Sequence, residues 1–244
     1  MGLWDYTLVL WLNQLIAYNE RTFFAALFLS DRVPWVLCSA VFVALWFIHG
    51  ERMARSLDET QDPVYRNRLV VVTILLGAVF AFIVARILNV LWDRPRPLAW
   101  MELQVPIAPE IWQEVVTAVG LGEAFPSDHT AFWGAVTAGL FLISRRAGWA
   151  GVACTTFFAA LRVALGYHYP SDMVAGFALG LIGVALAYAI RRRLIWLVNP
   201  FLQLFDHRPA LMYAFAMLVL LDITQRFAWL FGLLAILFGV HIPG

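Results

Sequence analysis

Long apolar runs alternate with short polar clusters along this chain. Several of the runs approach the roughly 20 apolar residues that a membrane-spanning helix needs. The runs that we expect to span are residues 33–48, 69–91, 130–144, 149–167 and 173–190. With one more span near the N-terminus, they predict an all-α fold: a polytopic membrane helical bundle with six core transmembrane helices.

Three further apolar stretches are short or are interrupted by polar residues. Residues 3–29 are interrupted by polar side chains, so they form either a poor first span or a helix lying in the interface. Residues 194–205 suggest an interfacial piece, and 210–240 form a candidate seventh span. We expect one integral-membrane domain over 1–244, with 194–244 as an apolar C-terminal extension.

Composition supports the membrane assignment. Hydrophobic residues make up 62% of the 244 residues, whereas soluble domains have about 45–50%. A net charge of +1 does not favour a nucleic-acid partner. Cys38 and Cys154 lie inside apolar runs, which indicates packing rather than a disulfide or a metal site. The first residues carry no positive segment of the kind that begins a cleaved signal peptide.

Arginine supplies every basic side chain, and its distribution predicts the topology. Clusters at 52–68, 145–146 and 191–193 should face the cytoplasm. The long connection 92–127 and the turn 166–172 then fall together on the outer face.

The turn at 162–172 carries the first candidate chemistry. It places Arg162, His168 and Asp172 within eleven residues of otherwise apolar sequence. A buried carboxylate can hold an imidazole in one tautomer and prepare it as a base or nucleophile. For this triplet alone, a helix-end histidine with an ordinary ion pair explains the pattern equally well.

The outer connection carries two more clusters. Arg94 and Arg96 alternate with prolines, which suits phosphate binding by guanidinium groups, or anchoring at the membrane interface. Ser127 or Asp128 begins the next helix as its N-cap, where amide groups can bind an anion. His129 would face that anion, or be a bystander in an interfacial cap.

Together the three clusters indicate phosphoryl transfer, because separate structural explanations for all of them become improbable. Arginines and amides would neutralise phosphoryl oxygens, one histidine would attack phosphorus, and a second would protonate the leaving oxygen. The sequence shows no acidic metal cage, so we expect neither metal nor cofactor.

These motifs resemble those of the type 2 phosphatidic acid phosphatase (PAP2) family, also called the acid phosphatase–haloperoxidase superfamily. Its pattern is Lys-x6-Arg-Pro, then Pro-Ser-Gly-His, then Ser-Arg-x5-His-x3-Asp. The corresponding residues here are Asn89-x6-Arg96-Pro97, Pro126-Ser127-Asp128-His129 and Leu161-Arg162-x5-His168-x3-Asp172. The resemblance covers about a third of the chain, and the surrounding runs match the six-helix membrane branch.

The resemblance implies a role for each matching residue. His168 would be the nucleophile that forms a phosphohistidine, with Asp172 as its partner and His129 as general acid. Arg96, Arg162 and the Ser127 backbone would bind phosphate. We add Arg94, Asp128, Asn89 and Arg86 as further candidates for phosphate binding.

Three positions depart from the family pattern. Asn89 replaces lysine, Asp128 replaces glycine and Leu161 replaces serine, and the missing lysine removes one phosphate cation. Asn89 before Arg-Pro-Arg-Pro, and Phe-Pro-Ser-Asp-His-Thr, resemble the bacitracin-resistance branch, the undecaprenyl-diphosphatases. Those enzymes remove the terminal phosphate of the C55 lipid carrier of cell-wall synthesis at the outer face of the plasma membrane.

The implied partners are a lipid phosphate substrate and membrane lipids. A phosphatidate or phosphatidylglycerophosphate phosphatase is the alternative enzyme. A transporter should show paired half-helices or internal symmetry, which the sequence lacks. A scaffold would not need His129, His168 and Asp172 together.

Arg86 offers a cation in place of the missing lysine. It precedes Asn89 by three residues, so both would share one helix face, inside an apolar run where an unpaired charge is costly. It contacts either the distal part of a diphosphate or a carboxylate on a neighbouring helix.

Overall fold

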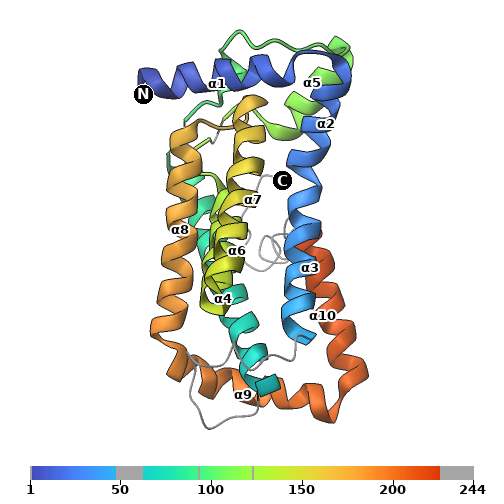
Figure 1. The fold of residues 1–244 in the computed structure, drawn as a ribbon, viewed down its shortest axis with the longest axis vertical. Helices are drawn as coiled ribbons and strands as arrows, with labels where there is room; N and C mark the ends of the chain where they lie inside the picture. The colour runs from blue at the N-terminus through green and yellow to red at the C-terminus, as the bar shows by residue number, and fades with distance from the viewer. Residues whose placement is uncertain (1, 48–62, 93, 123, 226–244) are drawn as a thin grey trace.

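The computed structural model describes residues 2–47, 63–92, 94–122 and 124–225. All regular structure in these ranges is helical, which confirms the all-α prediction (Figure 1). The elements are α1 (Leu3–Ile16), α2 (Glu20–Asp31), α3 (Val33–Phe47), α4 (Pro63–Leu91), the 3-10 turn η2 (Pro97–Ala99), α5 (Pro109–Val119), α6 (Asp128–Ile143), α7 (Arg145–Ala164), α8 (Pro170–Ala189), α9 (Arg191–His207) and α10 (Pro209–Thr224).

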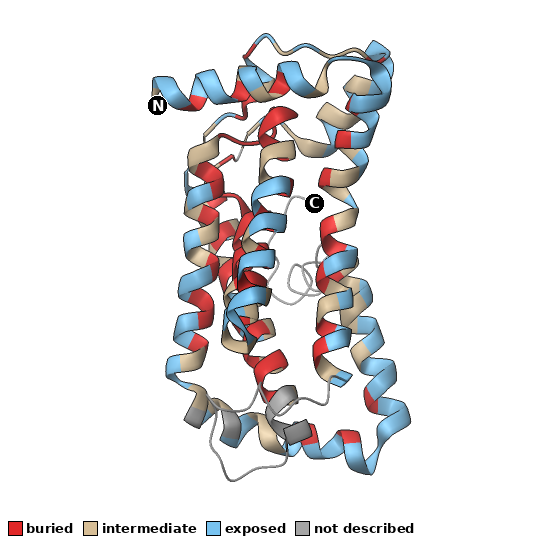
Figure 2. Cartoon of the chain, in the orientation of Figure 1, coloured by how far each residue is buried: buried red, intermediate tan, exposed pale blue. Residues whose placement is uncertain are grey.

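Helix α6 forms the centre of the bundle and packs mainly against α8, α4 and α7. Its first ten residues are all buried (Figure 2). The backbones approach closely because small residues line the contact. A Cβ atom at Gly180 of α8 would lie only 2.3 Å from the Ala131 carbonyl oxygen and 2.4 Å from the Ala135 nitrogen. Small residues are typical of helix contacts in membranes, where close backbone packing replaces hydrophobic burial.

The membrane helical bundle is confirmed, but the number of six spans is not. Among the described residues, four helical segments are long and apolar enough to cross a membrane: Glu20–Phe47, Arg68–Leu91, Arg145–Ala164 and Pro170–Ala189. A fifth candidate is the pair Trp196–His207 and Pro209–Thr224, bent by 119° at its break. Helix α6 runs alongside these segments with 16 residues.

Residues 3–29 form neither of the two single elements expected of them. Their first half, α1, lies across one end of the bundle, whereas α2 turns along the bundle and leads into α3 (Figure 1). The Asn19 side chain accepts the Thr22 N–H at 3.0 Å and caps the start of α2. The polar residues at 19–21 therefore mark the corner between two helices.

Helix α9 lies across the opposite end of the bundle, and α10 then turns back along it (Figure 1). The short interfacial piece expected at 194–205 falls within α9. The candidate span 210–240 is helical to Thr224, and its part beyond residue 225 lies outside the described residues. Most of the expected cytoplasmic loop at 50–68 also lies outside them.

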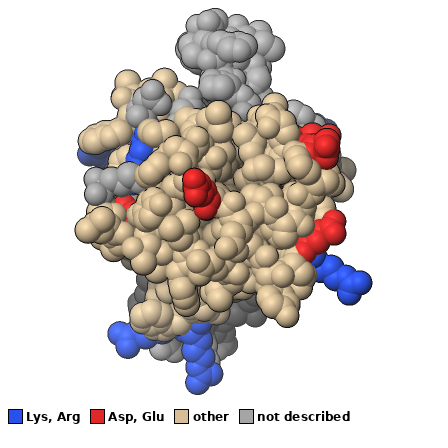
Figure 3. Space-filling view, turned by 90° about the horizontal axis from the view of Figure 1, so that it is seen from above, with Lys and Arg blue, Asp and Glu red and all other residues tan. Residues whose placement is uncertain are grey.

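The connection 92–127 and the turn 166–172 meet at the end of the bundle that α1 covers, as the sequence predicts. Arg145, Arg146 and the start of α9 lie at the other end (Figure 1). Seen from the α1 end, the surface is mostly uncharged, with a few separate acidic and basic side chains (Figure 3). Arg96 and Arg162 are buried beneath it.

Candidate active site

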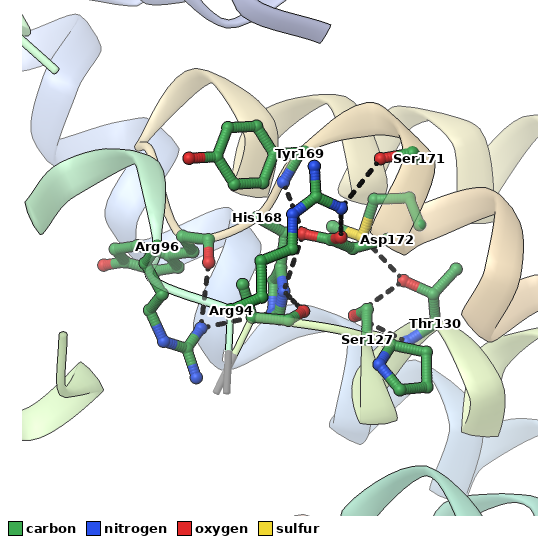
Figure 4. A network of polar contacts seen from close by, with 12 residues as sticks. Arg94, Arg96, Ser127, Thr130, His168, Tyr169, Ser171 and Asp172 are labelled. Atoms are coloured by element: carbon green, nitrogen blue, oxygen red, sulfur yellow. Dashed lines mark hydrogen bonds and ion pairs between the residues drawn. The ribbon is translucent and has the colours of Figure 1, made fainter. Parts of the chain in front are cut away.

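Three chain segments build the site: the stretch after α4, the start of α6 and the turn between α7 and α8 (Figure 4). Backbone hydrogen bonds join them: Ala124 N–H to the Arg94 carbonyl (2.8 Å), Leu98 N–H to the Gly166 carbonyl (2.9 Å) and Ser127 N–H to the Asp172 carbonyl (3.1 Å). Gly166 has φ +74°, a left-handed conformation that side chains disfavour, and this glycine permits the tight turn.

His168 lies in that turn and is 1% exposed. Its Nδ1 is 2.8 Å from the Ala124 carbonyl oxygen. A carbonyl can only accept a hydrogen bond, so Nδ1 carries the proton and Nε2 carries the lone pair. Nε2 lies 3.4 Å from Nη1 of Arg96. The nitrogen that can react as a nucleophile therefore faces a guanidinium group, where an anion would bind.

The surroundings of His168 keep it neutral. Burial, together with the positive charges of Arg96 and Arg162, holds the pKa of its imidazole well below the ordinary value of 6.5. A neutral imidazole retains the Nε2 lone pair, which is the form that can act as a nucleophile.

Arg96 is held rigidly by backbone carbonyls. Its Nε donates to the Gly122 carbonyl and its Nη1 to the Tyr167 carbonyl, both at 2.9 Å. Arg162, near the end of α7, is also buried, and its guanidinium carbon lies 5.1 Å from the centre of the Tyr167 ring. Both arginines are thus fixed near His168.

Asp172 does not hold His168 in the way that the sequence suggests. Its Oδ2 lies 4.0 Å from Nδ1 of His168 and instead accepts the N–H of Tyr169 at 2.8 Å. Its Oδ1 accepts from Nη1 of Arg94. The Ala124 carbonyl is the direct partner of His168, and Asp172 fixes the backbone turn that carries it.

The amide of Ser127 also differs from the expected anion site. Ser127 is the N-cap of α6, and its Oγ accepts from the N–H of Thr130 at 3.3 Å. Its own N–H donates to the carbonyl of Asp172, as given above. This amide therefore joins α6 to α8 and is already used within the protein.

His129, Asp128 and Arg86 form one connected group. Nδ1 of His129 lies 2.7 Å from Oδ1 of Asp128, and Oδ2 of Asp128 lies 3.5 Å from Nη1 of Arg86. The His129 ring packs against Trp35 and Trp133, with ring centroids 5.2 and 5.8 Å away. Arg86 thus contacts a carboxylate on a neighbouring helix, the second alternative for it, and Asp128 contacts Arg86 and His129.

Asn89 and Arg94, two further candidates for phosphate binding, make protein contacts. The Asn89 amide donates to the Pro126 carbonyl and so anchors the loop before α6. Arg94 contacts Asp172, and its Nη2 lies 3.4 Å from Oδ2 of Asp5. The asparagine that replaces the family lysine therefore has a structural contact of its own.

Sequence reasoning missed Asp5 and the Ala124 carbonyl. Asp5 could have been noticed as a single acid in the apolar run 3–12, since a buried charge needs a partner. A backbone carbonyl leaves no signal in the sequence. Within the described ranges, no three His, Cys, Asp or Glu residues form a group that could hold a metal, and a metal-independent reaction stays a prediction.

The fold and the site define an integral membrane protein in which buried arginines surround a histidine at one end of a helical bundle. The chain belongs to the PAP2 superfamily, whose family model matches residues 68–196, just over half of its length. This region includes every motif residue discussed above, whereas α1 lies outside it.

Two relatives by sequence share parts of the chain. The bacitracin transport permease protein BcrC of Bacillus licheniformis is 25% identical over 141 residues, 58% of this chain and 64% of that protein. Lipid A 1-phosphatase of Rhizobium etli is 43% identical over 58 residues, 24% of this chain and 25% of that protein. The chain thus spans less than two thirds of either relative.

One solved structure is similar to the chain. The crystal structure of Aquifex aeolicus LpxE shares 15% identity and a TM-score of 0.38, covering 62% of this chain and 85% of that one.

Proposed function

We propose that this chain is a membrane lipid phosphatase that acts through a phosphohistidine at His168. The observation that carries the proposal is the hydrogen bond from Nδ1 to the Ala124 carbonyl, which leaves the Nε2 lone pair facing Arg96. Membership of the PAP2 superfamily supports the same chemistry.

The reaction proceeds in two displacements. The Nε2 lone pair of His168 attacks phosphorus while the bond to the leaving oxygen breaks, and His129 donates a proton to that oxygen. The Ala124 carbonyl accepts the hydrogen bond of the imidazolium formed. Water then attacks phosphorus, His129 takes its proton, and the bond to Nε2 breaks to release phosphate. Arg96 and Arg162 stabilise the negative charge on the phosphoryl oxygens.

For the substrate we favour an isoprenoid lipid diphosphate, undecaprenyl diphosphate, hydrolysed to the monophosphate and phosphate. The similarity to BcrC and the motif residues that follow Asn89 support this choice. The chain would then recycle the lipid carrier of peptidoglycan synthesis and confer bacitracin resistance. It would lie in the bacterial plasma membrane, with its site on the outer face. A phosphatidate or phosphatidylglycerophosphate phosphatase remains the alternative.

The match to lipid A 1-phosphatase supports a second candidate, a phosphorylated glycolipid. Phosphate release by the purified protein should be compared on undecaprenyl diphosphate, phosphatidate, phosphatidylglycerophosphate and lipid A. The fastest substrate by kcat/KM identifies the class, and activity on none of them contradicts the proposal.

His168→Ala should lower turnover at least about a thousandfold, because it removes the group that forms the covalent intermediate. His129→Ala should retain phosphorylation by a substrate with a good leaving group, since acid catalysis then matters less. The matched control is His207→Ala, an exposed histidine of α9 at the other end of the bundle. Wild-type turnover in His168→Ala would exclude the mechanism.

A further inference from the structure

Helix α1 brings a buried carboxylate to the edge of the site from outside the PAP2 region. Asp5 is 2% exposed, although most of α1 is exposed or half-buried. Burying a charge is costly unless it is paired and hydrogen-bonded, so the contacts of Asp5 indicate what it does.

Asp5 caps helix α8, which follows it by more than 160 residues of chain. Its Oδ1 accepts the backbone N–H of Ser171 at 3.0 Å, and its Oδ2 accepts the Ser171 hydroxyl at 2.9 Å. Ser171 lies in the first turn of α8, where backbone N–H groups have no partner within the helix. A carboxylate is the group that the positive end of a helix favours.

The same carboxylate contacts Arg94, which also contacts Asp172. Nη2 of Arg94 lies 3.4 Å from Asp5, whereas Nη1 donates to Asp172 and, at 3.0 Å, to the Ser171 hydroxyl (Figure 4). The guanidinium carbon lies 4.1 Å from the centre of the Tyr169 ring. One arginine is therefore shared between two carboxylates and rests on the residue next to His168.

The network continues to the turn that carries His168. The other oxygen of Asp172 accepts the N–H of Tyr169, the residue directly after His168. The sequence of contacts runs from Asp5 through Arg94 to Asp172, and then to the backbone beside the imidazole. A change of charge at Asp5 thus alters the balance on Arg94 and, through Asp172, this turn.

We propose that Asp5 is a positioning residue for His168, contributed by helix α1 and acting through Arg94 and the start of α8. This inference rests on the proposed phosphatase function. Without the charge of Asp5, Asp172 is the only carboxylate left to pair with Arg94. The hydrogen bond that Asp172 accepts from the Tyr169 N–H then weakens. The imidazole then loses alignment with the bound phosphate, so the rate falls more than the affinity.

A second buried residue of α1 provides the matched control. The Asn13 amide donates to the carbonyls of Gln104 (3.2 Å) and Ala164 (3.1 Å), and its oxygen accepts the N–H of Gln104 at 2.8 Å. Asn13 thus joins α1 to the bundle through Gln104 and Ala164, away from the contacts of Arg94. Its removal tests the docking of α1 apart from the charge of Asp5.

The experiment is a double-mutant cycle on Asp5→Asn and Arg94→Gln, measured on undecaprenyl diphosphate in detergent micelles. Asp5→Asn should lower kcat about tenfold, the usual effect of losing one hydrogen bond to a charged group, with KM changed less than about twofold. In the Arg94→Gln background, the same change should lower kcat less than about twofold. Asn13→Ala should lower Tm and leave kcat within about twofold of wild type.

If His168→Ala abolishes turnover, three results would overturn the inference. The first is a wild-type kcat in Asp5→Asn, and the second is a double mutant whose loss of kcat equals the product of the two single losses. The third is a loss of kcat in Asn13→Ala as large as that in Asp5→Asn. If Asp5→Asn does not fold, Ser171→Ala removes the bridging hydroxyl and keeps both charges, and it should lower kcat severalfold. Unchanged kcat in that variant would contradict the inference too.

Discussion

Several charged side chains of the site contact each other, and two arginines act on His168. Arg86 contacts Asp128, and Arg94 contacts Asp5 and Asp172. Arg96 and Arg162 are the arginines whose charges act on the imidazole. Of the three arginines in the motifs, Arg96 and Arg162 are thus the two whose charges lower the pKa of His168.

The lowered pKa of His168 sets the acid side of the pH profile. Because its folded pKa lies below 6.5, the imidazole stays neutral as pH falls past that value and is protonated only at a lower pH. The pH dependence of kcat/KM reports the pKa values of the free enzyme. The apparent pKa of its acid limb should therefore lie below the ordinary pKa of histidine. The measurement is kcat/KM against pH with purified protein.

A variant can show whether the acid limb arises from ionisation of His168 or from ionisation of the substrate. Arg96→Gln removes one of the two positive neighbours that lower the pKa of His168, so the limb should move to higher pH. Substrate ionisation is common to both proteins and would leave the limb in place. An acid limb at the same pH in both proteins would contradict the assignment to His168.

The motifs predicted that the segments carrying Arg96, Ser127 and His168 meet, and backbone hydrogen bonds join these segments at one end of the bundle. The contacts of each residue could not be predicted. The Ala124 carbonyl and the Ser127 N–H belong to the backbone, which has the same groups at every position. His168 and Asp172 are four residues apart, but this spacing does not determine which donor the carboxylate oxygens of Asp172 contact.

At the scale of elements, the contact between α6 and α8 decides where the site residues lie. Gly176 and Gly180 of α8 lie against the α6 backbone, and an added Cβ at Gly176 would lie 2.2 Å from the Ser127 carbonyl oxygen. Backbone cannot move aside as a flexible side chain can. The spacing of these helices therefore depends on the absence of side chains at those two positions.

Gly180→Ala should destabilise the protein by about 1–3 kcal/mol, the usual cost of overpacking, despite the higher helix propensity of alanine. The control is Gly151→Ala in α7, where the added methyl would meet side-chain atoms no closer than 3.0 Å. Thermal unfolding in detergent should give a lower Tm for Gly180→Ala than for Gly151→Ala. Equal Tm values would show that the contact tolerates a wider spacing.

The apolar pattern predicted α6 and α8 to within about three residues at each end, whereas α4 and α7 begin six and four residues before the expected runs. It did not predict that α1 and α2 turn a corner. An apolar helix on the surface of a bundle and one through a membrane share the same composition. The partners of Asp5 and Asn13 hold α1 against the bundle, and those partners are distant in sequence.

At the scale of the whole molecule, the site end has a small apolar cluster of its own. Phe23, Ala26, Ile107, Leu165 and Tyr167 form its buried part, and residues of α5 pack around it. Helices α1 and α5 lie at the end of the bundle where α7 ends and α8 begins (Figure 1). The opposite end carries arginines at the starts of α7 and α9, which supports the proposed sidedness.

Cysteine labelling tests that sidedness. In a background lacking Cys38 and Cys154, a cysteine in place of the exposed Gln104 should react with an impermeant maleimide in intact cells. A cysteine in place of the exposed Gln203, at the other end, should react only after the cells are opened. The opposite labelling pattern would invert the topology and exclude a role in recycling lipids of the outer leaflet.

The link between Asp5 and Ser171 also concerns the order in which the protein is made. The two residues are 166 positions apart, and ribosomes add about 5–20 residues per second, so Asp5 is synthesised roughly ten to thirty seconds before its partner. Until then the Asp5 carboxylate of α1 cannot accept hydrogen bonds from Ser171. The contacts of Asp5 with the start of α8 can therefore form only after Ser171 has been synthesised.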